Sequence, residues 1–493
     1  MKTSRIMIAA PKSGSGKTLI TCALLGALKK RQINIASCKC GPDYIDPMFH
    51  RTVLGIASEN LDTFFTGEDE TRRLFAGFSA PYDMILTEGV MGLYDGLGGV
   101  RKEGSSYHLA EVTDTPIILV VDVHGMGYSM IPFISGFLEY DRKHLIKGLI
   151  LNRISRGFFE TICPFIKEEL SIEVLGYFEN KEEFKIDSRH LGLRLPNEIE
   201  DIRDILDKSA DYIERTVDID RLIELAGGAG ELDGKKINSD IDKKYKITNK
   251  KNIINKEFEN IKFNEEEIYK SLKEKEDENI NIPHELTLAV ARDEAFCFYY
   301  EANLRMFEER GVKIKYFSPL HDKELPQNID GILLGGGYPE IYADELSKNS
   351  SMLDSIKKAI SEGLPSLAEC GGFMYLHREL KDDKGKTYSL VGVIDAEVYY
   401  IGKSVRFGYI ELKDKDSKFI SENEKIKGHE FHYYDSTDNG TDVLASKPVS
   451  NKSWDCCYVG ENHWWGFPHL YYPSCPSFVD GFIRSMNDRS IEV

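Results

Sequence analysis

The sequence has no long apolar run. Its apolar stretches, such as residues 116–121, have the length of a strand and fall far short of the roughly 20 residues that cross a membrane. The run at residues 6–10 is likewise too short for the apolar core of a signal peptide. We therefore expect a soluble, cytoplasmic protein without a membrane partner.

Positive charge is also scarce. The chain has 63 Lys and Arg residues against 81 Asp and Glu residues, so its formal net charge at pH 7 is −18. This balance opposes nonspecific attraction to nucleic acid phosphates and to anionic lipids. We expect no nucleic acid partner, although a local basic pocket for an acidic small molecule remains compatible with this charge.

Paired cysteines are missing as well. The nine cysteines are scattered without any Cys-x-x-Cys spacing, and neither Cys38-x-Cys40 nor the adjacent Cys456 and Cys457 makes a zinc site alone. Most of the cysteines are expected to be reduced, buried and inert. A functional cysteine must therefore be identified by its setting in the fold.

A charged segment divides the chain, whose 493 residues exceed an ordinary single domain. Residues 231–281 contain 12 Lys and 13 acidic residues but no Pro, which predicts a solvated linker, with a marginal helix at 265–275. The expected organisation is a P-loop domain at 1–228, a linker at 229–284 and a second domain at 285–493.

A glycine-rich loop organises the first half. It reads Ala9-Ala10-Pro11-Lys12-Ser13-Gly14-Ser15-Gly16-Lys17-Thr18. A strand-like run, residues 6–10, leads into this loop, and a helix-forming stretch, residues 19–28, follows it. This order is typical of a P-loop, a phosphate-binding turn between a strand and a helix. The usual pattern begins with Gly where this chain has Pro11, so we interpret the loop as a variant P-loop.

The loop residues suit a bound nucleotide. We assign ATP binding to Gly14, Ser15, Gly16, Lys17 and Thr18. The glycines allow backbone N–H groups to turn toward phosphate oxygens at a helix N-terminus, whose dipole favours negative charge. The Lys17 ammonium is expected to reach the outer phosphates and the Thr18 hydroxyl to bind Mg²⁺. ATP and Mg²⁺ are thus the expected cofactors.

Short apolar runs alternate with longer helical segments after the loop. The runs that read as buried parallel strands are residues 33–38, 84–87, 117–121, 148–151 and 173–177. Residues 197–226 read as an amphipathic helix that closes the domain. The pattern predicts a doubly wound α/β fold, in which ligands bind at the carboxyl ends of the strands.

Polar residues follow three of these strands. Asp43, Tyr44 and Asp46 come after the second strand, where carboxylates bind Mg²⁺ or face a substrate, although Asp also forms ordinary turns. Glu88, directly after a buried strand, is typical of an acid that binds the metal or its water. Asn152 ends another strand, where P-loop proteins often read the nucleotide base, so we add it to the ATP site.

A second α/β pattern starts at residue 286. Strands are predicted at 287–291, 313–317 and 331–334, and helices at 300–310 and 352–362. The strand at 331–334 runs into Gly335-Gly336-Gly337, whose glycines are able to present backbone N–H groups to a ligand. A last short apolar strand leads to Ala368-Glu369-Cys370-Gly371-Gly372.

Cys370 has the setting of a nucleophile. A tight turn between a strand and a helix exposes the side chain, and the helix N-terminus is expected to lower the pKa of the thiol. The N–H of Gly371, with that of Gly336 or Gly337, is a candidate oxyanion hole. The candidate bases are His429, His432, His463 and His469, and spacing alone does not rank them.

The chain resembles the cobyrinic acid a,c-diamide synthases. The segments that carry the resemblance are the P-loop, residues 41–47, Asn60-Leu61-Asp62, residues 88–96, His190-Leu191-Gly192-Leu193, residues 293–300, Gly336-Gly337-Tyr338-Pro339-Glu340, residues 368–372 and Gly428-His429-Glu430-Phe431-His432-Tyr433. They cover nearly the whole chain apart from the charged segment. The resemblance implies a dethiobiotin-synthetase-like P-loop domain fused to a class I glutamine amidotransferase-like domain, both α/β.

The resemblance also implies site residues in the second domain. Cys370 corresponds to the glutaminase nucleophile. The activating His of the family lies near the C-terminus in a His-x-His-Phe context, which falls on His469, although the second His is Tyr471 here. His432 stays as a weaker candidate, and no third acidic member is identifiable.

In the first domain the resemblance implies ATP-dependent activation of a carboxylate. A substrate carboxylate attacks the γ-phosphate, and ammonia from glutamine displaces phosphate from the acyl phosphate. The implied reaction amidates the a and c acetate groups of a corrinoid in cobalamin synthesis. The metal is assigned to Thr18, Glu88 and Asp43, and the substrate and phosphoryl site to Asp43, Tyr44 and Asp46. The sequence is compatible with a homodimer.

Two rival interpretations remain. The nickel-sirohydrochlorin a,c-diamide synthases share these motifs, and sequence barely separates the two macrocycles. A partition-type ATPase with an inert C-terminal domain is a distant alternative, because it leaves the turn around Cys370 unexplained. A measurement of glutamine-dependent ATP turnover would exclude that alternative.

Overall fold

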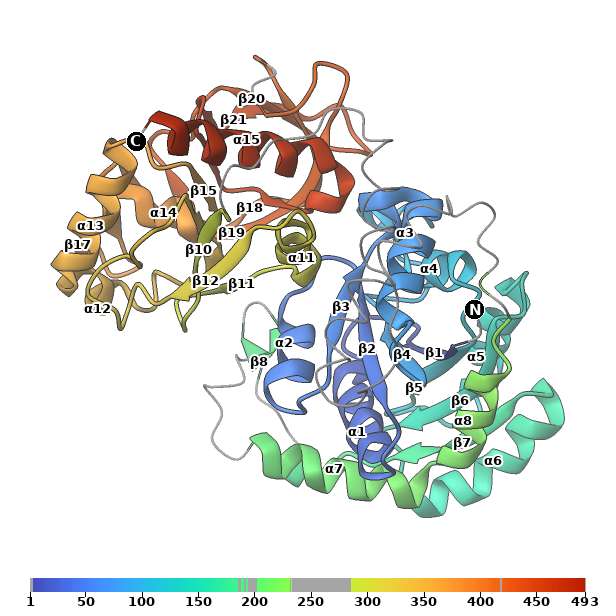
Figure 1. Ribbon diagram of the computed structural model, residues 1–493. Coiled ribbons are helices and arrows are strands. Elements are labelled where there is room, and N and C mark those ends of the chain that lie inside the picture. Colours follow the sequence, from blue (N-terminus) through green and yellow to red (C-terminus); the bar gives the residue numbers. More distant parts are fainter. Residues whose placement is uncertain are drawn as a thin grey trace, which may run out of the picture. The chain divides into compact units, whose positions relative to one another are not determined.

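The computed structural model describes residues 3–184, 188–189, 192–193, 202–230, 232, 285–416 and 419–492. The chain divides into two compact units, Met1–Ile237 and Asn238–Val493 (Figure 1). Most of the predicted linker, 229–284, lies outside the described residues, as does its predicted helix at 265–275. No helix in the described parts combines the length and apolar character needed to cross a membrane.

The N-terminal unit contains a seven-stranded parallel sheet with the order β3-β2-β4-β1-β5-β6-β7. Its strands are β1 (Ser4–Ala9), β2 (Ile35–Cys40), β3 (Ser58–Leu61), β4 (Met84–Glu88), β5 (Ile117–Asp122), β6 (Ile146–Asn152) and β7 (Glu173–Phe178). The strands predicted from apolar runs are confirmed, with β2 displaced by two residues. Strand β3 was not predicted, because its sequence SENL has no apolar run.

Helices surround this sheet. They are α1 (Lys17–Lys30), α2 (Ile45–Thr52), α3 (Thr63–Ser79), α4 (Ser106–Val112), α5 (Met130–Tyr140), α6 (Arg156–Leu170), α7 (Ile202–Thr216) and α8 (Ile219–Gly227). Helix α1 is rich in Ala and Leu and packs against α7 and the sheet, which buries most of its residues (Figure 1).

The single amphipathic helix predicted at 197–226 is wrong in the described residues. The chain forms α7 and α8 there instead. The break occurs at Asp218, whose side chain accepts a hydrogen bond from the Arg221 N–H (2.9 Å) and caps α8. Asp is a strong N-cap residue, so it starts a new helix at a point where the apolar pattern alone predicts one continuous helix.

The C-terminal unit contains a six-stranded sheet with the order β12-β10-β13-β15-β23-β22. Its strands are β10 (Thr287–Ala291), β12 (Lys313–Phe317), β13 (Gly331–Leu334), β15 (Ser366–Glu369), β22 (Tyr458–Val459) and β23 (His463–Gly466). All pairs are parallel except β22 with β23. The helices are α11 (Glu301–Glu309), α12 (Ala343–Lys348), α13 (Ser350–Ser361), α14 (Gly371–Leu376) and α15 (Pro476–Glu492). The predicted strands and helices of this half are therefore confirmed to within a few residues.

A second, mostly antiparallel sheet completes this unit. It contains β16 (His377–Lys381), β17 (Thr387–Ser389), β18 (Ile394–Asp414), β19 (Ile426–Ser436), β20 (Val443–Ser446), β21 (Ser453–Cys456) and β24 (His469–Leu470). A small separate pair joins β11 (Phe296–Phe298) to β14 (Gly336–Gly337). In the second sheet His429 of β19 pairs with His469 of β24, which brings two of the candidate bases together.

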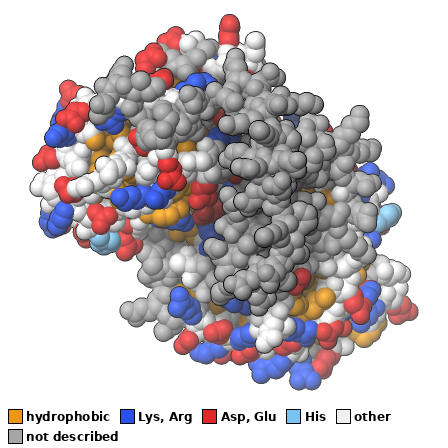
Figure 2. Space-filling model, in the orientation of Figure 1, with side chains coloured by type: hydrophobic (Ala, Val, Ile, Leu, Met, Phe, Trp, Pro, Cys, Tyr) orange, Lys and Arg blue, Asp and Glu red, His pale blue; other side chains and the backbone are white. Residues whose placement is uncertain are grey.

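The described surface carries both signs of charge. Among the coloured residues of Figure 2, Asp and Glu side chains are interspersed with Lys and Arg side chains in both units. Several acidic residues are held in ion pairs, such as Glu173 with Arg221 and Asp344 with Lys386. Such exposed ion pairs contribute little to the stability of the fold, and each one places a positive charge beside a negative one.

Candidate active sites

The glycine-rich loop joins β1 to α1 as the sequence predicts. Gly14 and Gly16 both have left-handed backbone angles, with φ of 75° and 83°. A Cβ at Gly16 would lie 2.4 Å from Nδ2 of Asn152, so this position has no room for a side chain. The Asn152 amide in turn donates to the carbonyl oxygen of Ser15 (2.8 Å). The loop therefore has a phosphate-binding conformation, and Asn152 supports its backbone.

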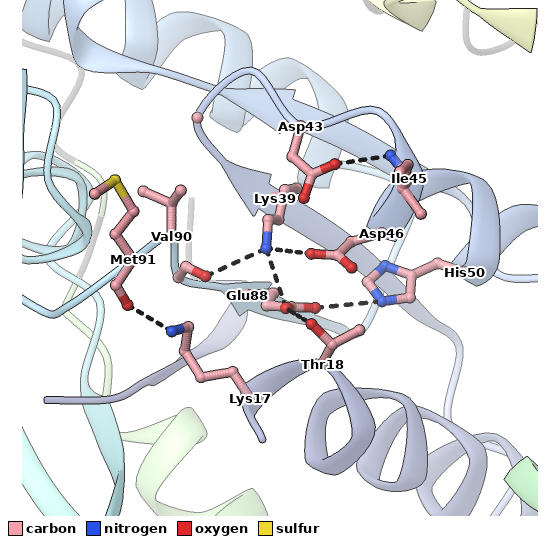
Figure 3. Close-up of polar contacts among 12 residues, drawn as sticks. Lys17, Thr18, Lys39, Asp43, Ile45, Asp46, His50, Glu88, Val90 and Met91 are labelled. Atoms are coloured by element: carbon pink, nitrogen blue, oxygen red, sulfur yellow. Dashed lines mark hydrogen bonds and ion pairs between the residues drawn. The ribbon is translucent and has the colours of Figure 1, made fainter. Parts of the chain in front are cut away.

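Lys17 lies in a buried position at the start of α1. Its Nζ donates a hydrogen bond of 2.5 Å to the carbonyl oxygen of Met91 (Figure 3). Burial, together with the nearby ammonium of Lys39, lowers the pKa of Lys17 to about 8. An amine that is disfavoured as a cation gains from an approaching anion, so the position suits a nucleotide phosphate.

Glu88 at the end of β4 lies at the centre of a polar cluster (Figure 3). Its Oε1 accepts hydrogen bonds from the Thr18 hydroxyl (2.7 Å) and the Lys39 ammonium (3.0 Å). Its buried Oε2 makes no hydrogen bond to the described residues and lies 3.7 Å from Nε2 of His50. Burial, with the negative charge of Asp46, raises the pKa of Glu88 to about 8.

Thr18 and Glu88 fit a magnesium site. A hydroxyl and a carboxylate lie in contact, and a second carboxylate oxygen is left without a hydrogen bond in the described part of the chain. Mg²⁺ needs few protein ligands, because it keeps waters and binds nucleotide phosphates. Asp43 makes a different contact here, since its Oδ1 accepts from the Ile45 N–H (2.9 Å), and its metal role stays a prediction.

The loop after β2 and the first turn of α2 bring two carboxylates, Asp43 and Asp46, to this cluster. Asp46 forms an ion pair with Lys39, and burial with the Asp46 charge raises the pKa of Asp43 to about 7. Tyr44 is buried directly before α2. The structure therefore gathers Asp43 and Asp46 with Glu88 around one ammonium, that of Lys39, while their roles in a phosphoryl and substrate site remain predictions.

Sequence reasoning missed Lys39 and His50. Lys39 lies in a fully buried strand, where the carboxylates of Asp46 and Glu88 outweigh burial and raise the pKa of its ammonium. His50 is buried in α2, with Nδ1 at 2.9 Å from the Ser37 hydroxyl. A lysine inside the apolar run of a strand was the available signal for the first. His50 offered no such signal in the sequence, because a single His in a helix is usually structural.

Cys370 lies at a sharp turn between β15 and α14. Its backbone is left-handed, with φ of 47° and ψ of −103°, and its N–H donates to the carbonyl oxygen of Gly466 (2.9 Å). A Cβ on Gly371 would lie 3.1 Å from the Gly337 nitrogen, so the turn packs closely against residues 335–337. The turn at Cys370 and the glycines predicted to form the oxyanion hole are thus brought together.

The expected lowering of the Cys370 pKa is wrong. Burial, followed by the carboxylates of Glu340 and Glu430, raises the pKa of this thiol, and the Gly371 N–H offsets only part of the rise. Solvent exclusion therefore outweighs the helix N-terminus in this structure. A thiol held protonated needs a neighbouring base to become a nucleophile.

His469 and His432, the two bases that the resemblance favours, differ in their surroundings. The ring of His469 stacks on that of His429, with centroids 5.0 Å apart, and a Cβ at Gly336 would lie 2.3 Å from its Cε1. Burial, with His429 and His432, lowers the pKa of His469, so its ring is held in the neutral form. Both ring nitrogens of His432 instead make hydrogen bonds. Nδ1 lies 2.6 Å from the backbone carbonyl oxygen of Tyr434, and Nε2 lies 3.2 Å from Oε2 of Glu430.

Comparison with known proteins matches each half of the chain to a domain family. Residues 6–281 match the model of the CobQ/CobB/MinD/ParA nucleotide binding domain, and residues 287–466 match that of the CobB/CobQ-like glutamine amidotransferase domain. The fold and these two matches thus define a nucleotide-binding unit joined in one chain to a glutamine amidotransferase unit.

Full-length relatives narrow the class further. Cobyrinate a,c-diamide synthase of Caldanaerobacter subterraneus subsp. tengcongensis is 37% identical over 94% of each chain. The protein of that name from Clostridium acetobutylicum is 36% identical over 97% of this chain and 99% of its own, and that of Priestia megaterium 32% over 98% and 97%. The chain belongs to the cobyrinate a,c-diamide synthase family. It is a ligase that takes nitrogen from glutamine.

Replacing Gly336 by Ala is expected to turn the His469 ring away from its site. The added Cβ would meet the ring at 2.3 Å, and a ring at the end of a side chain yields more easily than backbone. A misplaced catalytic group costs about 100-fold in rate, so glutamine hydrolysis should fall by about that factor. Glutamate release measures this loss, and amidation with free ammonia serves as the internal control. An unchanged rate of glutamate release would contradict the placement of His469.

Proposed function

We propose that this chain amidates the a and c acetate carboxylates of cobyrinic acid, using ATP and glutamine, in cobalamin biosynthesis. The observation that carries the proposal is that one chain of this family contains two separate sites. The first is a nucleotide-binding loop beside the buried carboxylate of Glu88, and the second is the turn at Cys370, with the neutral His469 beside Gly336. We further propose that residues 1–228 form the amidoligase domain and residues 285–493 the glutaminase domain.

The proposed glutaminase half uses Cys370 and His469. His469 takes the thiol proton, and the Cys370 sulfur attacks the side-chain carbonyl carbon of glutamine. Backbone N–H groups of Gly371 and of Gly336 or Gly337 hold the developing oxyanion. The proton on His469 passes to the leaving nitrogen, so that ammonia departs and a thioester remains. Water then hydrolyses the thioester to glutamate and restores the thiol.

The proposed ligase half uses the cluster around Glu88. The P-loop backbone and Lys17 bind the phosphates, and Mg²⁺ held by Thr18 and Glu88 would neutralise charge on the β- and γ-phosphate oxygens. Tyr44 and Asp46 face the substrate side, where a carboxylate oxygen attacks the γ-phosphorus and ADP leaves. Ammonia then attacks the acyl carbon of the acyl phosphate, phosphate leaves, and an amide is formed.

Product analysis tests the proposal directly. Purified protein is incubated with Mg²⁺, ATP, glutamine and cobyrinic acid, and a parallel sample contains nickel-sirohydrochlorin. Mass spectrometry is expected to show two successive exchanges of carboxylate for amide in the corrinoid alone. Amidation of the nickel macrocycle alone would keep the mechanism and overturn the substrate, and a lack of reaction with both would overturn the proposed function.

A further inference from the structure

Glu369 joins the two catalytic segments of the C-terminal unit. It is the last residue of β15, directly before Cys370, and its side chain is buried, with 6% of the residue exposed. Its Oε1 accepts a hydrogen bond from the Tyr472 hydroxyl (2.7 Å), and its Oε2 accepts one from the Leu470 N–H (3.2 Å). Both carboxylate oxygens thus bind the segment that directly follows His469.

The covalent neighbours make this contact short and stiff. One chain neighbour of Glu369 is Cys370, and one chain neighbour of Leu470 is His469, so a single carboxylate spans the distance between the two strands. Leu470 is also held on its other side, because its carbonyl oxygen accepts from the Asn303 amide (2.8 Å).

The sequence after His469 offers no acid that would orient its ring directly. No Asp or Glu occurs between His469 and Asp480, and Tyr471 packs its ring edge-on against Tyr300 at 5.2 Å. The ring of His469 instead lies on that of His429, in paired strands. The backbone that carries this imidazole is the backbone that Glu369 binds.

We propose that Glu369 is a positioning residue of the glutaminase site, whose carboxylate holds the β24 backbone, and through it His469, in register with Cys370. This inference rests on the roles proposed above for Cys370 and His469. Glu369 touches neither substrate nor the reacting atoms in this assignment. Its contribution comes from the reach and hydrogen bonding of its side chain, not from its charge.

A pair of variants separates reach from charge. Glu369→Gln keeps the length, accepts from the Leu470 N–H with its oxygen and donates to the Tyr472 oxygen with its amide. Glu369→Asp keeps the charge but is one methylene shorter. We expect glutamine hydrolysis by Glu369→Gln to stay within about threefold of wild type, and kcat of Glu369→Asp to fall about 10- to 100-fold with little change in KM for glutamine.

Two further measurements keep the outcome specific. Amidation with free ammonia is expected to be unchanged in both variants, and thermal unfolding shows that both are folded. If Glu369→Asp hydrolyses glutamine normally while Glu369→Gln fails, the charge matters and the proposal is overturned, as it is if both variants match wild type. Glutamine hydrolysis by Cys370→Ala at the wild-type rate would instead overturn the proposed function.

Discussion

Lys17→Ala is expected to stop amidation with either glutamine or free ammonia, while glutamine hydrolysis at Cys370 persists. Lys17 starts α1 inside the buried cluster, where its ammonium donates to the Met91 carbonyl oxygen, and in the proposed function this ammonium binds the outer phosphates. Loss of one positioned donor in such a site costs about 100- to 1,000-fold, so amidation should fall at least that far. The measurement is diamide formation by mass spectrometry beside glutamate release.

Lys12→Ala is the matched control for this variant. Lys12 belongs to the same loop, but its side chain is exposed, and we expect amidation near the wild-type rate. A large loss in this control would show that Lys17 is not the only lysine of the loop that amidation needs. Equal loss of hydrolysis and amidation in Lys17→Ala would show that the two chemical steps are not separable.

Cys370→Ala is expected to produce the opposite pattern. Without the sulfur no thioester forms, so glutamine-dependent amidation should fall by about 1,000-fold or more, the scale seen when a nucleophile is removed. Amidation with ammonium chloride should continue, because the cluster around Glu88 is untouched. The rates with the two nitrogen sources, measured on the same preparation, give the result.

Cys475→Ala serves as the control for the thiol. Cys475 is buried in the same unit, with its sulfur at 3.2 Å from the Ser477 hydroxyl, and has no place in the proposed reaction. We expect both nitrogen sources to work in this variant. If Cys370→Ala loses amidation with ammonia as well, the model of two separate sites fails.

The parallel sheets were predictable because their signal is local. A buried parallel strand reads as a continuous apolar run, and β1, β4 and β5 were found from such runs. The P-loop and the turn at Cys370 were likewise visible, since each depends on glycines at fixed positions beside a strand. The antiparallel sheet was not predicted, because β18 mixes exposed and buried residues over 21 positions without regular alternation.

The composition of the sites was harder to predict than their location. The pairing of His429 with His469, and the contact of Glu369 with Leu470, join residues far apart in the chain. Local patterns carry no information on such pairs. The predicted lowering of the Cys370 pKa was wrong for a related reason. Burial of the thiol by distant segments raises its pKa by more than the adjacent helix N-terminus lowers it.

The backbone conformation at Cys370 lowers the stability of the fold at a position that the proposed reaction needs. A residue with a side chain in that left-handed conformation costs the folded state about 1–3 kcal/mol, a penalty that glycine would avoid. The surrounding unit must therefore hold the turn in place, and the Cys370 N–H bonded to Gly466 and the Gly372 N–H bonded to Gly335 do so. A chain optimised only for folding would have glycine at this position, and under the proposed role of Cys370 it would then lack the nucleophile of the glutaminase.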